Sequence, residues 1–478
     1  MDTVDIHEGQ LKDASSHEIE DIDATEVVSF TPEEEKALVR KIDMTLLPTV
    51  WVMYLLSYLD RTNIGNAKIS GMEVDLNLTS NEYSIALVVF FVGYVVFEVP
   101  SKYDFSTHDL ALGRSRPSIF LSSIMILWGA LTCVMAVVKD FSHLVVLRVI
   151  IGCIESGFAP GVLLVLSSWY KQTEQSKRFG VFISAAVLSG AFGGLIAAGI
   201  VDGLEGVHGI RGWRWLFIIE GVITVGCALV SLFVLPDFPA TTRRLSDRER
   251  QIAVARLARE NVTATTEDTE HLSSLGACRV ACQDFRTWAF VVGYMVIVGS
   301  STLTYFYPTL VKGLFGDAST EKVNFLTVPI YGVAFVATGI TSYCGDKFPT
   351  WRGLIIAGWL AFSLICSVIV CAVYNFTARY VLLVLMAAGL WSTNGGTLAY
   401  ASSAFAGMHP QARGVALAMV NALGNLAQIY GSYLFPDKDS PKYIKGFSVI
   451  SAMLAVGVVV FLVLHIWFRR RLRSGIIQ

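Results

Sequence analysis

Apolar stretches recur along the chain at a length that suits a lipid bilayer. A helix needs about 20 mainly apolar residues to cross the hydrocarbon layer. Stretches of this length predict twelve spans, near residues 46–66, 83–102, 117–138, 142–166, 179–200, 213–235, 287–308, 325–345, 353–374, 378–400, 413–435 and 447–468. The pattern therefore predicts an all-α membrane protein with 12 transmembrane helices.

Polar segments divide these spans into two halves. The long polar interruption at 236–286 is rich in arginine and separates six spans from six. We expect the following organisation: a disordered cytoplasmic tail at 1–45, an N-terminal six-helix half at 46–235, a cytoplasmic central loop at 236–286, a C-terminal six-helix half at 287–468 and a cytoplasmic tail at 469–478. Such a layout is typical of secondary transporters whose halves rock about a site near the membrane midplane.

The basic residues predict the orientation of the chain. If the N-terminus is cytoplasmic, about 25 of the 37 Lys and Arg residues lie in inner segments and about 10 in outer ones. Because positive loops stay on the cytoplasmic side, we expect both termini and the central loop there.

Composition excludes several other classes of protein. With 54% hydrophobic and 16% charged residues, the chain is too apolar for a soluble core, and a net charge of -2 argues against a nucleic-acid partner. Cys278 and Cys282 lie in a polar segment and could carry a lipid or a metal, but no second ligand pair accompanies them. No metalloprotease helix, nucleophile elbow or phosphate-binding loop occurs, so we expect no enzyme activity, catalytic residue, metal or cofactor.

Ionisable residues are few inside the predicted spans, and four of them form a pattern: Asp60 and Arg61 in the first span and Arg148 and Glu155 in the fourth. A charge at membrane depth costs ~2.5 kcal/mol or more, so each needs a partner or a function. Counting ~1.5 Å per residue places Asp60 and Arg148 both ~10 Å from the outer edge. Glu155 follows Arg148 by two helical turns on the same face. Glu220, in the sixth span, is interpreted as a structural residue near the inner half.

Two interpretations of these four residues remain open. They could form a salt-bridge network that only locks the N-terminal half. Alternatively, one arginine binds a substrate carboxylate through its planar fork, and an acid released from its pair then accepts a proton more easily. In the second case, substrate binding and proton binding are coupled.

Several motifs occur together in a recognisable order. They are "LDRTNIGNAK" (59–68), "FEVPS" (97–101), "RVIIGCIESGFAPG" (148–161), "SSWYKQTEQSKRFG" (167–180), "GWRWLFIIEG" (212–221), "LPDFP" (235–239) and "GNLAQIYGSYLFPDKDSPKYIKGF" (424–447). With them the chain resembles the anion:cation symporter branch of the major facilitator superfamily, and within it the fungal permeases of the allantoate, nicotinate and pantothenate type. The resemblance covers most of residues 40–470.

This resemblance implies roles for individual residues. Arg61 would face the substrate carboxylate, and Arg148 would be the charge-pairing base. Asp60 and Glu155 would carry protons. Polar contacts from the C-terminal half are also implied. By position, the best-placed amides there are Asn394, Asn421, Asn425 and Gln428, for which ordinary hydrogen bonding between helices is the alternative.

The inner loops carry a loose form of the family's latch motif. Asp109 and Arg114 lie between spans 2 and 3, and Asp346, Lys347 and Arg352 occupy the equivalent place between spans 8 and 9. The segment 101–118 is more polar than the apolar ending typical of the family. The fifth span lacks the proline of drug:proton antiporters, which favours uptake over efflux.

We therefore expect a proton-coupled transporter that takes up a small organic carboxylate, such as a vitamin or an allantoate-like anion, by alternating access. Its partners would be the substrate, protons and the lipid bilayer, and it would act as a monomer in the plasma membrane. One alternative is an exporter or uniporter of an anionic metabolite. Another, from a different class, is a nutrient sensor that binds without transporting.

Overall fold

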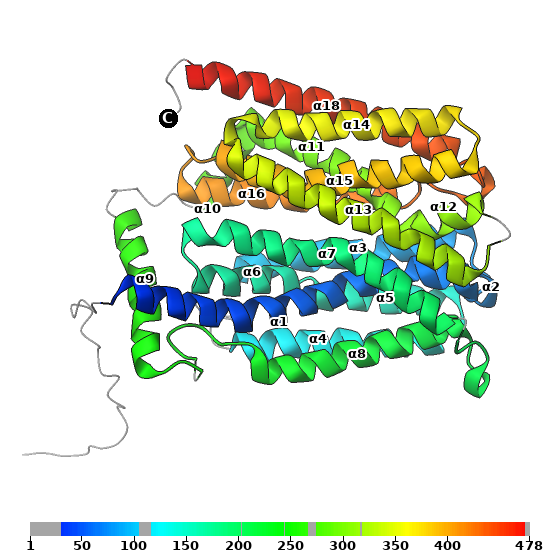
Figure 1. The fold of residues 1–478 in the computed structure, drawn as a ribbon, viewed down its shortest axis with the longest axis horizontal. Coiled ribbons are helices and arrows are strands. Elements are labelled where there is room, and N and C mark those ends of the chain that lie inside the picture. Colours follow the sequence, from blue (N-terminus) through cyan, green and yellow to red (C-terminus); the bar gives the residue numbers. More distant parts are fainter. Residues whose placement is uncertain are drawn as a thin grey trace, which may run out of the picture.

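The helices of the protein lie side by side in two bundles. The computed structural model describes residues 30–104, 116–201, 203–242, 244–265, 274–315 and 318–473. Within these ranges, all regular elements are helices. Figure 1 shows one bundle above the other, with their helices roughly parallel. The expected all-helical fold is confirmed.

The first bundle contains the helices that precede the central loop. They are α1 (Pro32–Ala67), α2 (Glu73–Asp75), α3 (Ser80–Asp104), α4 (Pro117–Val134), α5 (Phe141–Glu155), α6 (Phe158–Trp169), α7 (Gln172–Val201) and α8 (Gly212–Val234). A π-helical segment, Lys68–Met72, continues α1, and Gly71 within it has a φ of 106°, which a residue with a side chain rarely adopts.

The second bundle follows the central loop. Its helices are α11 (Phe285–Ser301), α12 (Tyr307–Leu314), α13 (Thr320–Lys347), α14 (Arg352–Ala372), α15 (Phe376–Ala404), α16 (Pro410–Asn425), α17 (Ala427–Gly431) and α18 (Ile444–Arg473). A 3-10 segment, η4 (Thr302–Phe306), joins α11 to α12. The loop itself forms α9 (Asp247–Thr265) and α10 (Ser274–Gln283).

Eleven stretches in the described ranges are long and apolar enough to cross a membrane. The remaining predicted span, 413–435, is covered by two shorter helices, α16 and α17, because the α-helix is interrupted at Leu426. The predicted fourth span is also broken, between α5 and α6, at Ser156 and Gly157.

Helix α1 begins earlier than its apolar pattern predicts. Thr31 caps it in a reciprocal capping box with Glu34, and Pro32 occupies its first turn. Both features stabilise a helix start, so α1 extends through the charged residues before the membrane. The expectation of disorder up to residue 45 is therefore wrong for residues 32–45, whereas residues 1–29 lie outside the described part of the chain.

The two bundles pack most closely at one end. Figure 1 shows α7 and α13 converging toward the end opposite α9. Small residues permit this approach: a Cβ atom on Gly190 would lie 2.1 Å from the ring of Tyr331, and one on Gly65 would lie 2.7 Å from the carbonyl oxygen of Tyr305. We call this the outer end and the end that holds α9 the inner end, following the orientation expected from the basic residues.

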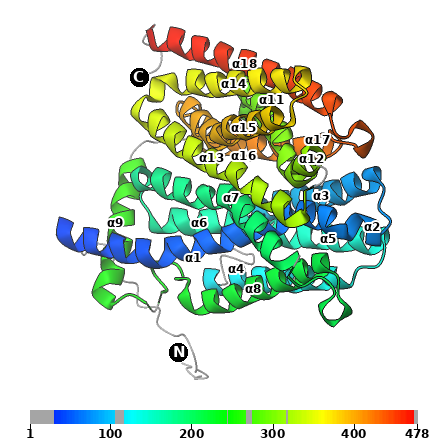
Figure 2. The same cartoon turned by 45° about the vertical axis from the view of Figure 1, so that its right-hand side comes forward.

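Helix α9 is bound to the inner end of the first bundle, as the turned view in Figure 2 shows. The side chain of Arg256 is fully buried; its Nε lies 3.0 Å from Glu35 of α1 and its Nη2 2.5 Å from Glu174 of α7. Lys41 of α1 and Glu249 of α9 form a second ion pair at 2.8 Å. Helix α10, in contrast, packs against α16 of the second bundle.

Candidate functional site

Five charged side chains of the described parts of α1, α5 and α8 lie buried inside the first bundle. These residues, which we call the charged cluster, are Asp60 and Arg61 from α1, Arg148 and Glu155 from α5, and Glu220 from α8. Each is at most 8% exposed. Because unpaired charge is costly at membrane depth, the contacts of each group indicate what it does.

Arg61 is paired with Glu155. Its Nε lies 2.7 Å from Oε1 of Glu155, and the hydroxyl of Ser57, one turn earlier on α1, donates a hydrogen bond to the same oxygen. The other carboxyl oxygen of Glu155 has no hydrogen-bond partner among the described residues. Glu155 is therefore bound through Oε1 alone among the described residues.

Aromatic rings surround the guanidinium of Arg61. Its Cζ lies 4.7 Å from the ring centre of Tyr94, 4.9 Å from that of Tyr58 and 5.5 Å from that of Phe90. Such contacts favour a cation by the charge distribution of the ring face. In the described ranges the hydrogen bond of Arg61 uses Nε, which leaves the fork of Nη1 and Nη2 for a further partner.

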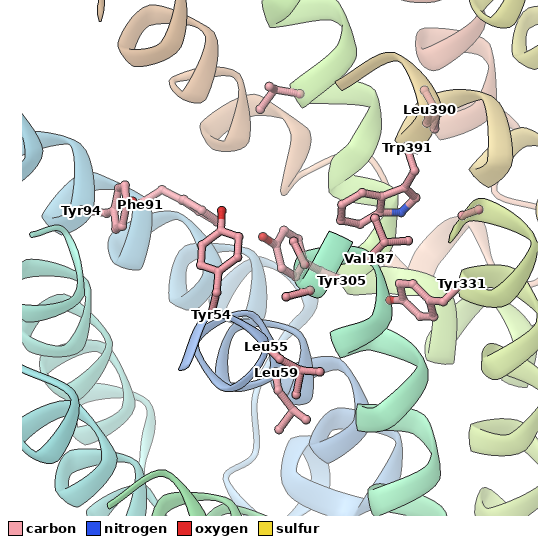
Figure 3. Packing of buried hydrophobic residues seen from close by; sticks show 14 of the residues in the cluster. Tyr54, Leu55, Leu59, Phe91, Tyr94, Val187, Tyr305, Tyr331, Leu390 and Trp391 are labelled. Atoms are coloured by element: carbon pink, nitrogen blue, oxygen red, sulfur yellow. The ribbon is translucent and has the colours of Figure 1, made fainter. Parts of the chain in front are cut away.

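More aromatic side chains lie where the two bundles meet. Figure 3 shows Tyr54 of α1 and Tyr94 of α3 on one side, and Tyr305 of η4 and Trp391 of α15 on the other. The ring of Tyr54 stacks on Phe182 of α7, with 3.9 Å between centres. Both bundles thus contribute rings to the region next to Arg61.

Asp60 points to helices other than those that Arg61 contacts. Its Oδ2 accepts a hydrogen bond from Thr132 of α4 at 3.4 Å, and its Oδ1 has no partner within the described ranges. The carboxyl groups of Asp60 and Glu220 interact with each other, and the amide of Asn63 also faces Glu220. Asp60 is therefore next to an acid, and the neighbouring arginine in the sequence is not its partner.

Arg148 is also not a direct partner of Asp60. It interacts electrostatically with Asp60 and Glu155, but in the part of the chain that the structure describes it forms no ion pair within 4.0 Å. Its Nε and Nη2 have no hydrogen-bond partner there. The residue counts placed Asp60 and Arg148 at one depth, and in the described ranges the two side chains interact without a direct ion pair.

The amides expected from the second bundle are divided among local contacts. Asn394 accepts a hydrogen bond from Tyr294 at 3.1 Å, and Asn425 donates to Asn421 at 3.4 Å on the same helix. For Gln428 on α17, the buried Oε1 has no partner among the described residues. Helix α17, which carries Gln428, packs against α3, the helix of Phe90 and Tyr94.

Three of the residues predicted to form the latch, Asp346, Lys347 and Arg352, lie at the junction of α13 and α14. Arg352 lies 3.5 Å from Asp346 and donates hydrogen bonds to Gly345 and Ser403. The ammonium of Lys347 lies near the ring of Phe348. Asp109 and Arg114 lie outside the described residues.

An ion pair between the bundles lies at the outer end. Lys68 Nζ lies 3.0 Å from Asp437, whose backbone N–H donates a hydrogen bond to Ser80 of α3. Lys312 of α12 donates to the carbonyl of Ile69 at 2.9 Å. These contacts, together with the close packing of α7 and α13, close the outer end.

Sequence reasoning missed the place of Glu220 in the cluster. Glu220 was assigned to the inner half, but α8 begins at the outer end with Gly212. Eight residues at ~1.5 Å each place Glu220 ~12 Å from that end, which is the depth of Asp60. The same residue count that was applied to Asp60 and Arg148 would have found it.

Comparisons with known proteins agree with this architecture. A model of the Major Facilitator Superfamily matches residues 50–432. The chain is 34% identical to the MFS transporter prlL of Fungal sp. (strain NRRL 50135), over 97% of this chain and 93% of that one. It is 31% identical to the MFS-type transporter cnsO of Penicillium expansum, over 92% and 85% of the two chains.

A similar fold is found among solved structures. The crystal structure of a bacterial homologue of the human lysosomal transporter Spinster, in an inward-facing and unoccupied conformation, aligns with a TM-score of 0.68 at 14% identity. The alignment covers 92% of this chain and 99% of that chain. At this identity the likeness concerns the fold.

Proposed function

Because the chain belongs to the major facilitator superfamily and is a multi-pass membrane transporter, we propose that it takes up a small organic carboxylate together with protons by alternating access. The observation that carries this proposal is the state of Arg61. A buried guanidinium is bound to Glu155 through Nε, while its Nη1 and Nη2 fork is available between aromatic rings.

An arginine fork fits a carboxylate in a bidentate manner, with two parallel N–H···O bonds. A carboxylate at Nη1 and Nη2 would compete with Glu155 for the positive charge of Arg61. Glu155 is 1% exposed and has no hydrogen-bond partner on Oε2 among the described residues, so losing part of its pairing favours its protonated form. Substrate and proton thus bind together.

The remaining predicted residues have supporting roles in this proposal. Arg148 supplies a positive charge to Asp60 and Glu155 without binding either directly. Asp60 is the second proton-carrying acid. Gln428 is the amide of the second bundle best placed to contact the substrate, since its buried Oε1 has no partner in the described ranges.

In this proposal, alternating access provides the path by which the substrate crosses the membrane. The contacts of Lys68, Asp437 and Lys312 close the outer end in this conformation. For uptake, these contacts form after the substrate has entered from outside, and the substrate then leaves toward the inner end. This is the rocking motion expected of two six-helix halves.

Uptake of radiolabelled carboxylates into cells that express the chain tests the proposal. The panel comprises aliphatic, aromatic and ureido carboxylates at acidic and neutral external pH. We expect acid to stimulate the uptake of one class, Arg61→Ala to abolish it, and Glu155→Gln to remove its dependence on pH. Arg40→Ala, at an exposed position of the same helix, is the matched control. Failure of correctly localised protein to take up any carboxylate would contradict the proposal.

A further inference from the structure

Glu220 is a buried acid that the proposal above does not use. It is 1% exposed, and neither of its carboxyl oxygens has a hydrogen-bond partner among the described residues. Asp60, which faces it from α1, also has an oxygen without a partner there. Two carboxyl groups therefore face each other inside the bundle, where water cannot stabilise two negative charges.

The charged and titratable groups around Glu220 come from three neighbouring helices. Asp60 faces it from α1 and Arg148 from α5, while α4 contributes the thiol of Cys133 beside Asp60. The nearest positive charge, Arg148, forms no ion pair within 4.0 Å in the described ranges. It cannot neutralise both Asp60 and Glu220, because it also faces Glu155.

The charges of the cluster do not balance if all five residues are ionised. Arg61 and Arg148 provide two positive charges, and the three acids provide three negative charges. One excess negative charge would then lie in the membrane interior. A single proton on the acids cancels it, and the pair of acids without a strong donor is where that proton is most stable.

The amide of Asn63 gives Glu220 a way to exist in both protonation states. Asn66 donates a hydrogen bond to Oδ1 of Asn63 at 2.8 Å, which leaves the N–H groups of Nδ2 directed elsewhere. Nδ2 of Asn63 has no hydrogen-bond partner among the described residues, and the side chain of Asn63 lies beside Glu220, so its N–H groups are available to that acid. An amide donor stabilises the ionised carboxylate, so Glu220 can give up its proton without being left in an apolar environment.

We infer that Asp60 and Glu220 share one proton between their facing carboxyl oxygens, and that Glu220 is a third proton-coupling residue of the transporter. This inference rests on the proposed proton-coupled function. The step is a proton transfer alone: the proton leaves one carboxyl oxygen for the other, or for water when the bundle opens, and no other bond changes.

Two measurements on Glu220→Gln test the inference. The first is the infrared carbonyl band of protonated carboxylic acids, recorded on purified protein in lipid at neutral pH. We expect the wild-type protein to show a band that is absent from both Glu220→Gln and Asp60→Asn, because the acid that remains ionises. Glu321→Gln, at an exposed position of α13, is expected to retain it. A band unchanged in both variants would overturn the inference, whether or not any substrate is known.

The second measurement separates proton coupling from a structural role. Proteoliposomes are loaded with substrate, and exchange of labelled for unlabelled substrate is compared with accumulation driven by a pH gradient. We expect Glu220→Gln to lose accumulation at least 10-fold while exchange stays within about twofold of wild type. Loss of both activities would indicate a structural role and overturn the inference. So would a sodium gradient that drives accumulation while a pH gradient does not.

If wild-type protein moves no carboxylate but the infrared band behaves as expected, the proposed function fails and the shared proton stands. If wild-type uptake is stimulated by acid but neither substitution changes the infrared band, the proposed function is supported and the inference of a shared proton is contradicted. The two proposals are therefore distinguishable.

Discussion

Asp60 and Arg61 are adjacent in the sequence, yet their charged groups contact different helices. Arg61 binds Glu155 of α5, whereas Asp60 faces Thr132 of α4 and Glu220 of α8. Consecutive residues of a helix point ~100° apart, so the two charges cannot face the same neighbour. Arg61 with Glu155 and Asp60 with Glu220 thus form two groups on separate sides of α1.

Tight binding of the substrate should require the planar guanidinium fork of Arg61 as well as its positive charge. Arg61→Lys preserves the positive charge, but one ammonium cannot hold Glu155 and also offer a planar pair of donors. We expect the KM of uptake to rise at least ~10-fold, equivalent to ~1.4 kcal/mol. Initial uptake rates over a range of substrate concentrations measure this, with Arg40→Lys as the control. An unchanged KM would mean that the substrate does not use the fork.

Closure of the outer end should depend on Gly190. The Cβ of Gly190→Ala would overlap the ring of Tyr331, so α7 and α13 could not approach as they do here. Overpacking costs ~1–3 kcal/mol, which would shift the population toward an open outer end by ~5-fold to ~150-fold. Electron paramagnetic resonance distances between spin labels at the exposed Asn77 and Lys438 report the shift.

Gly199→Ala is the matched control for this substitution. Gly199 lies on the same helix, and a Cβ there would meet no atom within 4 Å. We expect its distance distribution to equal that of the wild type. Equal distributions for both variants would show that the contact with Tyr331 does not limit closure.

The ion pair of Lys68 and Asp437 should contribute modestly to the same closure. Asp437→Asn removes one charge, but Lys68 retains Glu73 at 3.6 Å and the ring of Tyr83 at 4.6 Å. Because the side chain of Asp437 is 39% exposed, we expect a loss of only ~0.5–1 kcal/mol, or an approximately twofold to fivefold shift toward the open state. The same spin labels measure it.

Lys445→Gln provides the comparison for that ion pair. It breaks a contact with Asp439 at 3.3 Å, and both residues belong to the second bundle. No shift between the open and closed states is expected. A shift as large as that of Asp437→Asn would attribute the effect to surface charge at the outer end in general.

Arg256 should hold α9 against the first bundle. Arg256→Ala removes the base that joins Glu35 to Glu174 and leaves Lys171 as the remaining partner of Glu35. Because both acids are partly exposed, we expect the loss of these charge-assisted hydrogen bonds to cost ~1.5–3 kcal/mol. We expect the amides of α9 to exchange hydrogen faster by orders of magnitude. Arg248→Ala, whose pair with Glu34 is exposed, is expected to change exchange only slightly. Equal protection of α9 in both variants would contradict this role.

The sequence predicts the fold well because bilayer thickness sets the length of every apolar stretch. Its errors lie where local chemistry overrides hydropathy. The cap at Thr31 starts α1 before the first apolar stretch, and the interruption at Leu426 divides one span into two helices. Neither feature changes the average hydropathy of a long window, so neither is visible in the pattern that predicted the spans.

The sequence predicts the depth of the charged-cluster residues along their helices, but it does not predict which of these side chains touch. Residue counts give the level of Asp60, Arg148 and Glu220 along their helices. Which of them touch depends on how far each helix is rotated about its axis, and this is set by packing with other helices. Close contacts such as Gly152 against the backbone of Phe90 fix that rotation for α5. These contacts join residues that are far apart in the sequence. The periodic pattern within one helix does not predict them.

The central loop is divided between the two bundles, since α9 is bound to α1 and α7 whereas α10 packs on α16. Helix α9 ends at Thr265 and α10 begins at Ser274. Each bundle therefore has one of the two loop helices packed on it. A gene divided at this point would encode two polypeptides, each with a complete half of the transporter and the loop helix that belongs to it.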